Sequence, residues 1–225
     1  MDLYFKQLTD WAMANFMLVN EKKTKEMLIT ASRSATISPF PGIQRVSSFK
    51  LLGVFVSEDL KWAEHVNFVT SKANSRLHFL KQLKRAGISK DDMLHFYVGF
   101  IRPVLEYAAP VWHTSLTNEQ SDHLESIQKR AFRIIHGYSR ITDASYENFC
   151  AELSITPLCV RREELSKNFF DKLFDPGCCI HHLLPEKRDM SQSQKLRKAT
   201  QYQAPFARTE RFKNSFLLYA LNNYL

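Results

Sequence analysis

The sequence predicts an α+β protein that is mainly α-helical. Three observations predict this class: apolar residues recur at helical spacing over most of the chain, the segments rich in β-formers are short and fall within residues 1–60, and residues 185–225 are polar and basic. A hydrophobic content of 44% over 225 residues is enough to bury a core. The expected organisation is a helix with a small antiparallel β-hairpin in residues 1–60, a helical bundle in 61–184 and a basic extension in 185–225.

The first part begins with a predicted helix over residues 3–19, where apolar residues have helical spacing and no glycine or proline interrupts them. Residues 26–30 and 48–56 are short and rich in Leu, Ile, Val and Phe, which is typical of strands. Pro39, Pro41 and Gly42 mark an irregular loop between them. We expect these two strands to form the protein's only sheet.

Two helices are predicted next. The first carries apolar residues three or four positions apart and ends at Gly87; these residues are Trp62, Val66, Val69, Ala73, Leu77 and Leu80. The second begins after Ser89, whose hydroxyl is suited to cap the free backbone N–H groups, and has an apolar body over residues 93–107. Pro103 lacks an N–H group, so we expect a kink or a break near residues 101–103.

The remaining helices are predicted from the same spacing. Apolar residues between Leu124 and Ile134 indicate a helix that Thr117 or Asn118 begins and Gly137 ends. Residues 144–153 and 157–174 are further predicted helices. Residues 185–225 carry eight basic and three acidic side chains, so we expect a loosely ordered extension that ends in a short helix at residues 216–221.

Charge favours an anionic partner, because 31 Lys and Arg face 23 Asp and Glu and give a net charge of +8. The sequence has neither a secretory start nor an apolar run near the ~20 residues that span a membrane. Its four cysteines do not read as a disulfide framework. We therefore expect that the protein has no membrane as a partner and that it is intracellular, either nuclear or cytoplasmic.

A set of motifs in the first sixty residues carries a family resemblance. The first follows the pattern Leu-x-x-Trp-x-x-x-Asn-x-x-Leu-x-Asn-x-x-Lys-Thr-x-x-Met, and its residues are Leu8, Trp11, Asn15, Leu18, Asn20, Lys23, Thr24 and Met27. It resembles the helix and turn that follow the catalytic aspartates in reverse transcriptases of non-LTR (LINE-type) retrotransposons. The next motif resembles that family's Phe/Tyr-Leu-Gly hairpin, which grips the primer end; it comprises Phe49, Lys50, Leu51, Leu52, Gly53 and Val54.

Downstream residues resemble the thumb of the same family. They are Leu60, Trp62 and His65, the helix around residues 71–85, Ile101, Arg102, Pro103, Leu105, Glu106, Tyr107, Pro110, Val111, Trp112, Ile127, Gln128, Lys129, Arg130, Ala131, Arg133 and Ile134. The resemblance covers almost the whole chain, in the family's order. It implies the end of an RNA-directed DNA polymerase palm, a helical thumb and an RNA or DNA template–primer as partner.

One departure limits the activity that the resemblance implies. The family's paired aspartates lie in a Phe/Tyr-x-Asp-Asp turn just before the matched region, and this turn is absent here. Nucleotide addition needs carboxylates that hold two Mg²⁺ ions ~3.5–4 Å apart. Asp91 and Asp92 follow Ser-Lys at a predicted helix start, where the helix dipole accounts for them. We therefore expect a part of a polymerase that is inactive alone, with Mg²⁺ only in the intact parent enzyme and no small-molecule substrate.

The resemblance also names candidate site residues. Lys23 would lie near the phosphates of the incoming nucleotide, although Lys22, Lys23 and Lys25 equally fit a solvated turn. Leu52, Gly53 and Val54 would form the primer grip. The segment 61–90 contains seven basic residues and one acidic, which fits either phosphate contacts or a solubilising surface. Our candidate backbone contacts are Lys72, Arg76, Lys84, Arg85, Lys129, Arg130 and Arg133.

Other constellations are less specific. A cluster of Cys178, Cys179, His181 and His182 has metal-ligand chemistry, but adjacent cysteines with no second Cys-x-x-Cys pair fit a zinc site poorly, so we expect no metal there. Aromatic residues suited to stack on bases are expected instead to pack in the core; they are Trp62, Phe96, Phe100, Tyr107 and Trp112. No nucleophile elbow or triad signature is present.

Two alternatives remain open. One is a nucleic-acid-binding module that keeps thumb-type phosphate contacts and binds without sequence preference. The other comes from residues 20–29, which resemble a segment labelled as the N-terminal region of alkylated-DNA-repair dioxygenase homologues that modify transfer RNA. A His-x-Asp…His iron site and a glycine-rich methyl-donor loop are both missing from this sequence, which disfavours the second alternative.

Overall fold

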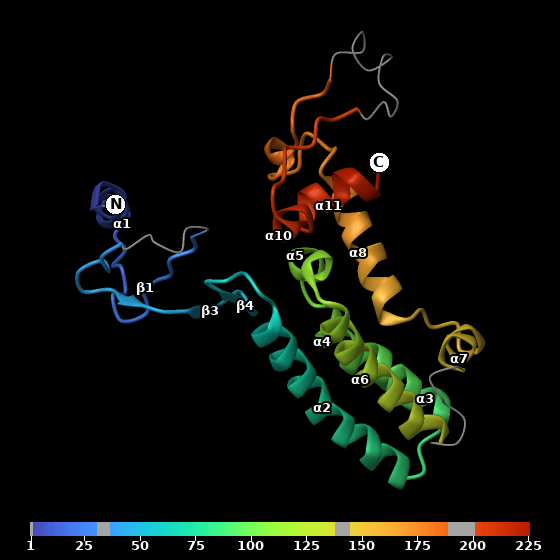
Figure 1. Cartoon of the computed structure of the whole chain (residues 1–225). Helices are drawn as coiled ribbons and strands as arrows, with labels where there is room; N and C mark the ends of the chain where they lie inside the picture. The colour runs from blue at the N-terminus through green and yellow to red at the C-terminus, as the bar shows by residue number, and fades with distance from the viewer. Residues whose placement is uncertain (1, 31–36, 138–144, 189–200) are drawn as a thin grey trace. The chain divides into compact units, whose positions relative to one another are not determined.

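The computed structural model describes residues 2–30, 37–137, 145–188 and 201–225, drawn in Figure 1. The chain forms two compact units, Met1–Lys61 and Trp62–Leu225. The described part is mainly helical with short strands, which confirms the predicted fold class. The first boundary lies one residue from the predicted one, whereas the C-terminal segment belongs to the same unit as the helical bundle.

The N-terminal unit begins with helix α1 (Asp2–Ala14), which ends before the predicted residue 19 because Phe16 adopts a left-handed φ of 56°. Strands β1 (Lys25–Glu26) and β2 (Gln44–Arg45) pair in parallel. The Glu26 carboxylate joins them by a 2.6 Å ion pair to Arg45. The predicted strand at residues 26–30 is therefore wrong beyond its first residue.

A hairpin replaces the predicted single strand at residues 48–56. Strand β3 (Ser48–Leu51) pairs antiparallel with β4 (Val54–Ser57). The two residues between them turn the chain through positive φ, 47° at Leu52 and 90° at Gly53. Apolar composition alone did not reveal this turn, because leucine rarely adopts positive φ, although the family resemblance implied a hairpin here.

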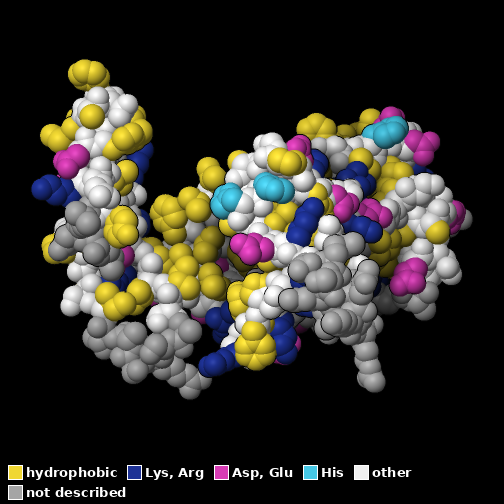
Figure 2. Space-filling view, turned by 90° about the horizontal axis from the view of Figure 1, so that it is seen from above, with side chains coloured by type: hydrophobic (Ala, Val, Ile, Leu, Met, Phe, Trp, Pro, Cys, Tyr) yellow, Lys and Arg dark blue, Asp and Glu magenta, His cyan; other side chains and the backbone are white. Residues whose placement is uncertain are grey.

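Apolar side chains stay exposed on the N-terminal unit. Trp11 of α1 is 58% exposed and Phe16 is fully exposed. Figure 2 shows hydrophobic side chains over the visible surface of this unit, at the left of the view. The first helix thus buries little of its apolar surface within its own unit.

The C-terminal unit is built around two long helices that lie side by side, α2 (Ala63–Arg85) and α6 (Asn118–His136). Every apolar residue predicted for the α2 face is buried. Thr117 and Gln120 form a capping box at the start of α6, and Gly137 ends it at a φ of 104°, as predicted. Local sequence signals therefore determine where α6 begins and ends.

The predicted kink before Pro103 is a π turn. Helix α3 (Lys90–Phe96) passes into the π-helical segment Tyr97–Ile101 and then into α4 (Arg102–Glu106). Because a proline removes one N–H and its ring crowds the carbonyl four residues earlier, the wider π turn accommodates it without ending the helix.

Shorter helices complete the unit. Two of them, α5 (Ala109–Trp112) and α10 (Glu210–Lys213), were not predicted, whereas α7 (Tyr146–Glu152), α8 (Leu158–Lys172) and α11 (Phe216–Asn223) were predicted within a few residues. Within the described residues, 3₁₀ turns lie at His113–Ser115 and His181–Leu183. The predicted helix start at residue 144 lies outside the described residues. Across the described ranges, no helix combines the length and apolarity needed to cross a membrane.

The C-terminal segment is packed, which corrects the expected loose extension over its described part. Ala220 and Leu221 of α11 and Tyr202 form a buried cluster with Phe170 and Leu173 at the end of α8. The hydroxyls of Thr114 and Ser115 both donate to the Asn214 carbonyl at 2.8 Å. Much of the basic stretch, residues 189–200, lies outside the described residues.

Candidate nucleic-acid interface

The four basic residues predicted along α2 point to different sides of the helix. The Arg76 guanidinium donates to the Phe100 carbonyl in the π turn, whereas the Lys84 ammonium donates to the Ile134 carbonyl on α6 at 2.5 Å. Residues on a helix are rotated by ~100° per position, so Arg76 and Arg85 lie on opposite sides. These residues therefore do not form one phosphate-binding face.

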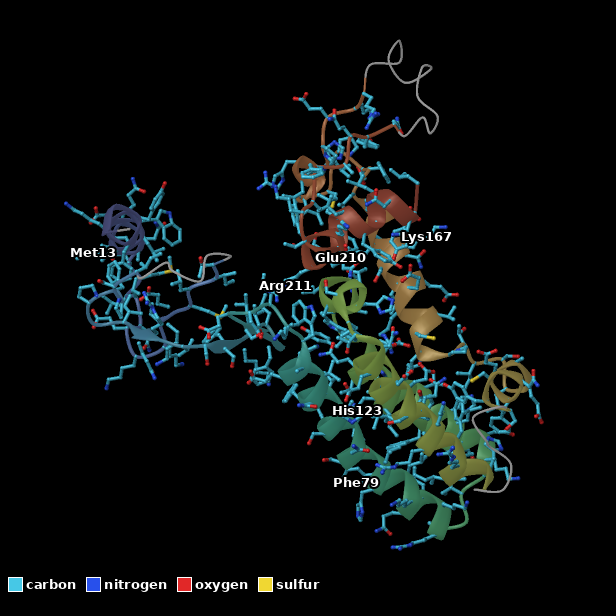
Figure 3. The ribbon with its side chains drawn as sticks, in the orientation of Figure 1. Met13, Phe79, His123, Lys167, Glu210 and Arg211 are labelled. Atoms are coloured by element: carbon cyan, nitrogen blue, oxygen red, sulfur yellow. The ribbon has the colours of Figure 1, made fainter. Side chains whose placement is uncertain are left out.

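An open cleft instead lies between α2 and α6. Its volume is about 420 Å³, and it is lined by Asn74, His123, Ser126, Ile127, Arg130 and Arg133. The Arg130 guanidinium reaches across it and donates to the Asn74 side-chain oxygen at 2.7 Å. Figure 3 marks His123 on α6. The structure thus brings two of the predicted arginines together with side chains from a second helix.

The chemistry of the cleft suits an anion. Its lining supplies two guanidinium groups, an imidazole, a hydroxyl and an amide, and none of the six lining residues is acidic. Arginine presents several N–H donors in a planar fork that matches phosphate oxygens. Hydrogen-bond donors of this kind bind a phosphate backbone without reading its sequence.

Sequence reasoning missed three members of this cleft. Asn74, His123 and Ser126 are polar but not cationic, so a search for basic residues passes over them. The available signal was helical spacing, because His123, Ser126, Arg130 and Arg133 recur three or four positions apart and so share one side of α6.

The other predicted contacts lie elsewhere. Lys72 is exposed, with its ammonium 6.0 Å from the centre of the Phe68 ring, and Arg85 is exposed near the end of α2. The Lys129 ammonium lies 5.0 Å from the centre of the Tyr146 ring, beside a different cavity that also includes Glu125. These residues do not line the α2–α6 cleft.

A buried polar network fixes α6 in place. The Tyr97 hydroxyl donates to the Gln128 side-chain oxygen at 2.5 Å, and the Gln128 amide donates to the Tyr146 hydroxyl at 2.8 Å. Burial raises the pKa of both phenols, so they stay neutral donors. This network lies in the interior and includes Gln128 of α6, whereas Arg130 and Arg133 of the same helix line the cleft.

The residues named by the resemblance in the N-terminal unit have clear positions. Leu52, at the tip of the hairpin, is 85% exposed, while Val54 is buried at the start of β4. Lys23 is exposed in a turn in which its backbone N–H donates to the Asn20 carbonyl and side chain. The solvated-turn interpretation of Lys23 agrees with this geometry.

The paired aspartates act as predicted for a helix start. Asp91 and Asp92 lie in the first turn of α3, and the Ser89 hydroxyl accepts a hydrogen bond from the Asp92 backbone N–H at 3.1 Å. The same hydroxyl donates to the Asp92 carboxylate at 2.6 Å. Ser89 therefore caps the helix, and the two aspartates place negative charge in its first turn, where the helix dipole favours it.

The predicted packing of the aromatic residues is partly wrong. Trp62 and Trp112 are buried, as expected, but Phe100 is 60% exposed and Tyr107 is 53% exposed. Helical spacing alone could not show this, because the π turn changes which residues face the core. Of the five aromatic residues named in the prediction, Phe100 and Tyr107 are therefore exposed, whereas Trp62 and Trp112 are not.

The cysteine and histidine cluster has other contacts. One ring nitrogen of His181 lies 2.7 Å from the Leu173 carbonyl, and one of His182 lies 2.9 Å from the Cys179 carbonyl. Within the described ranges, no group of three or more His, Cys, Asp or Glu side chains is arranged to hold a metal ion.

Comparison with known proteins adds no relative to this picture. The choice of the α2–α6 cleft as a candidate site therefore depends on its own geometry, and the family resemblance depends on the sequence motifs. No family model, no curated protein and no solved structure matches the chain.

Proposed function

We propose that this chain is the palm-end, hairpin and thumb portion of a reverse transcriptase of the non-LTR retrotransposon kind, and that its helical unit holds the phosphate backbone of an RNA or DNA template–primer. The observation that carries the binding role is the α2–α6 cleft, with Arg130 and Arg133 in a lining that has no acidic residue. Phosphate is one of the anions whose oxygens match such a donor set.

The hairpin supports the polymerase part of the proposal. The resemblance implies a primer-gripping hairpin at residues 49–54, and β3 and β4 turn at Leu52 and Gly53 within that segment. At the tip Leu52 is 85% exposed, whereas Val54 is buried, so the tip is the part of the hairpin suited to touch a nucleic acid. Nucleotide addition itself is not assigned to this chain, because its Asp91–Asp92 pair lies in the first turn of a helix that Ser89 caps.

A second candidate is a nucleic-acid-binding module with the same cleft and no part in polymerisation. The net charge of +8 and the cleft support this module as strongly as they support a polymerase part. The two candidates differ in one respect: a polymerase part prefers a recessed primer end, whereas a module binds any duplex of the same length.

Anisotropy titrations test both candidates. We expect the purified chain to bind a labelled RNA–DNA template–primer in a salt-dependent way, because bound cationic groups release counterions. The double variant Arg130→Ala/Arg133→Ala should weaken binding, while the matched double variant Lys187→Ala/Arg208→Ala, which removes two exposed charges elsewhere, should bind nearly as well as the parent.

The primer end decides between the candidates. Tighter binding to a recessed end than to a blunt duplex, reduced by Leu52→Asp, supports the polymerase assignment; equal binding supports the module. Equal loss in the cleft and control variants would show only non-specific charge attraction and would overturn the binding role. Primer extension by the chain with Mg²⁺, abolished by changing one of its own acidic residues, would overturn the non-catalytic assignment.

A further inference from the structure

A second groove lies against α2, between this helix and the π turn. Its volume is about 410 Å³, and it is lined by Arg76, Phe79, Gln82, Leu83, Phe96 and Phe100. Arg76 and Asn74 are two positions apart, so at ~100° per position this groove and the α2–α6 cleft lie on different sides of α2. The groove is thus a site separate from the phosphate-binding cleft.

Exposed aromatic rings form the walls of this groove. Phe79 is 59% exposed and Phe100 is 60% exposed. The rings of Phe96 and Phe100 are stacked, with centroids 5.1 Å apart and planes 18° apart. Figure 3 marks Phe79 on α2. A single exposed phenylalanine is ordinary, but three rings that gather around one hollow form a surface for a flat apolar group.

The π turn places Phe100 at the surface. Tyr97 and Ile101 are fully buried on the core side of this turn, while Phe100 points outward onto Phe96. The Phe100 carbonyl also accepts the hydrogen bond from Arg76, which holds the guanidinium at the rim. A π turn within an α-helix is frequently found at functional sites.

Charge and size restrict what the groove can hold. Arg76 is the one ionisable residue of the lining, and the exposed Lys72 lies one helical turn before it. A folded protein partner needs ~800 Å² on each side, which six lining residues do not supply. A small planar group attached to a negative charge fits both the rings and the cationic rim.

We propose that this groove stacks unpaired nucleobases of a single-stranded RNA or DNA, while Arg76 and Lys72 meet the adjacent phosphates. The inference deepens the proposed function and rests on it, since it adds a single-strand site beside the duplex-binding cleft. Every base has a flat aromatic face, so the site has little sequence preference.

The test compares the chain with Phe100→Leu and Phe79→Leu, which remove a ring but keep apolar volume. The control is Phe206→Leu, which removes an exposed ring far along the chain from the groove. The probes are a short oligothymidylate, an abasic strand of equal length and the template–primer duplex. Thermal melting of each variant, compared with the parent, establishes that it is folded.

We expect each groove variant to bind oligothymidylate about 5- to 150-fold more weakly, since stacking of that strength is typical for one base. The abasic strand and the duplex should bind all four proteins equally. A strand carrying 2-aminopurine should lose fluorescence on binding the parent and less on binding Phe100→Leu.

Unchanged oligothymidylate binding in both folded groove variants, with duplex binding intact, would overturn this inference and leave the proposed function standing. If the parent chain bound none of the nucleic-acid probes, that result would instead overturn the proposed function. Groove variants that bind oligothymidylate normally but abolish self-association in sedimentation velocity would assign the groove to a second copy of the chain and reject the nucleobase.

Discussion

The carboxylate of Glu125, buried on α6, accepts a hydrogen bond of 2.9 Å from the backbone N–H of Leu158, the first residue of α8. Its other oxygen accepts from the Cys159 N–H at 3.0 Å. Pro157 precedes α8 and has no side chain able to cap it. A neighbouring helix therefore provides the negative cap that the α8 sequence lacks.

Glu125→Gln should lower the free energy of unfolding by about 1–3 kcal/mol, because the amide keeps one acceptor oxygen but turns its NH₂ donor toward the other backbone N–H, and the negative charge at the start of α8 is lost. Glu147→Gln is the matched control, since Glu147 is exposed and lines the same cavity as Glu125 and Lys129. Urea unfolding followed by circular dichroism measures both. Equal stabilities of the two variants would contradict the capping role.

Lys84→Met should affect stability more than nucleic-acid binding. The Lys84 ammonium satisfies the Ile134 carbonyl in the last turn of α6, so its loss should cost about 1 kcal/mol. Lys81→Met removes an exposed charge from the same helix and should leave the urea midpoint nearly unchanged. A larger effect on duplex affinity than on unfolding would restore Lys84 as a phosphate contact.

Arg130→Ala should reduce the salt dependence of duplex binding. Each phosphate contact contributes ~0.7–0.9 to the slope of log affinity against log salt, so the slope should fall by about 1. Arg208→Ala, an exposed arginine outside the cleft, should change the slope by less. Anisotropy titrations over a range of salt concentrations provide the comparison, and an unchanged slope for Arg130→Ala would rule out its phosphate contact.

His65 should make stability depend on pH. Burial beside Trp62 and Trp112 lowers the pKa of its imidazole from 6.5 to about 4, so the folded state holds it neutral. Between these values the unfolded chain binds the proton and the folded chain does not. The contribution of neutral His65 to the free energy of unfolding is therefore fully present above pH 6.5. It is lost as the pH falls toward 4, and the free energy of unfolding falls by roughly 3 kcal/mol.

His65→Phe removes this titration and keeps a ring in the same place. We expect the difference in unfolding free energy between pH 7 and pH 4.5 to be smaller in the variant than in the parent, since other titrating groups contribute equally to both. Urea unfolding at the two pH values measures it. The exposed His123→Gln should behave like the parent. An identical pH dependence of the parent and His65→Phe would contradict the assignment.

Local sequence signals predicted the helical parts of the fold well. Ser89, Thr117 and Gly137 act within one turn of their own positions, so the start of α3 and both ends of α6 follow from neighbouring residues. The apolar spacing of α2 predicted its buried face for the same reason. The three-residue spacing of Arg130 and Arg133 likewise predicts that they lie on one side of α6.

The sequence by itself determined the helices, their caps, the basic character of the chain and the motifs that resemble a reverse transcriptase. Tertiary structure decided the parallel pairing of β1 with β2, the cap that Glu125 gives to α8, the packing of α11 on α8 and the joining of Asn74 to the α6 arginines. Each of these contacts joins residues far apart in the chain, and such a contact forms only when the packing of whole elements offsets the entropy of closing the loop between them.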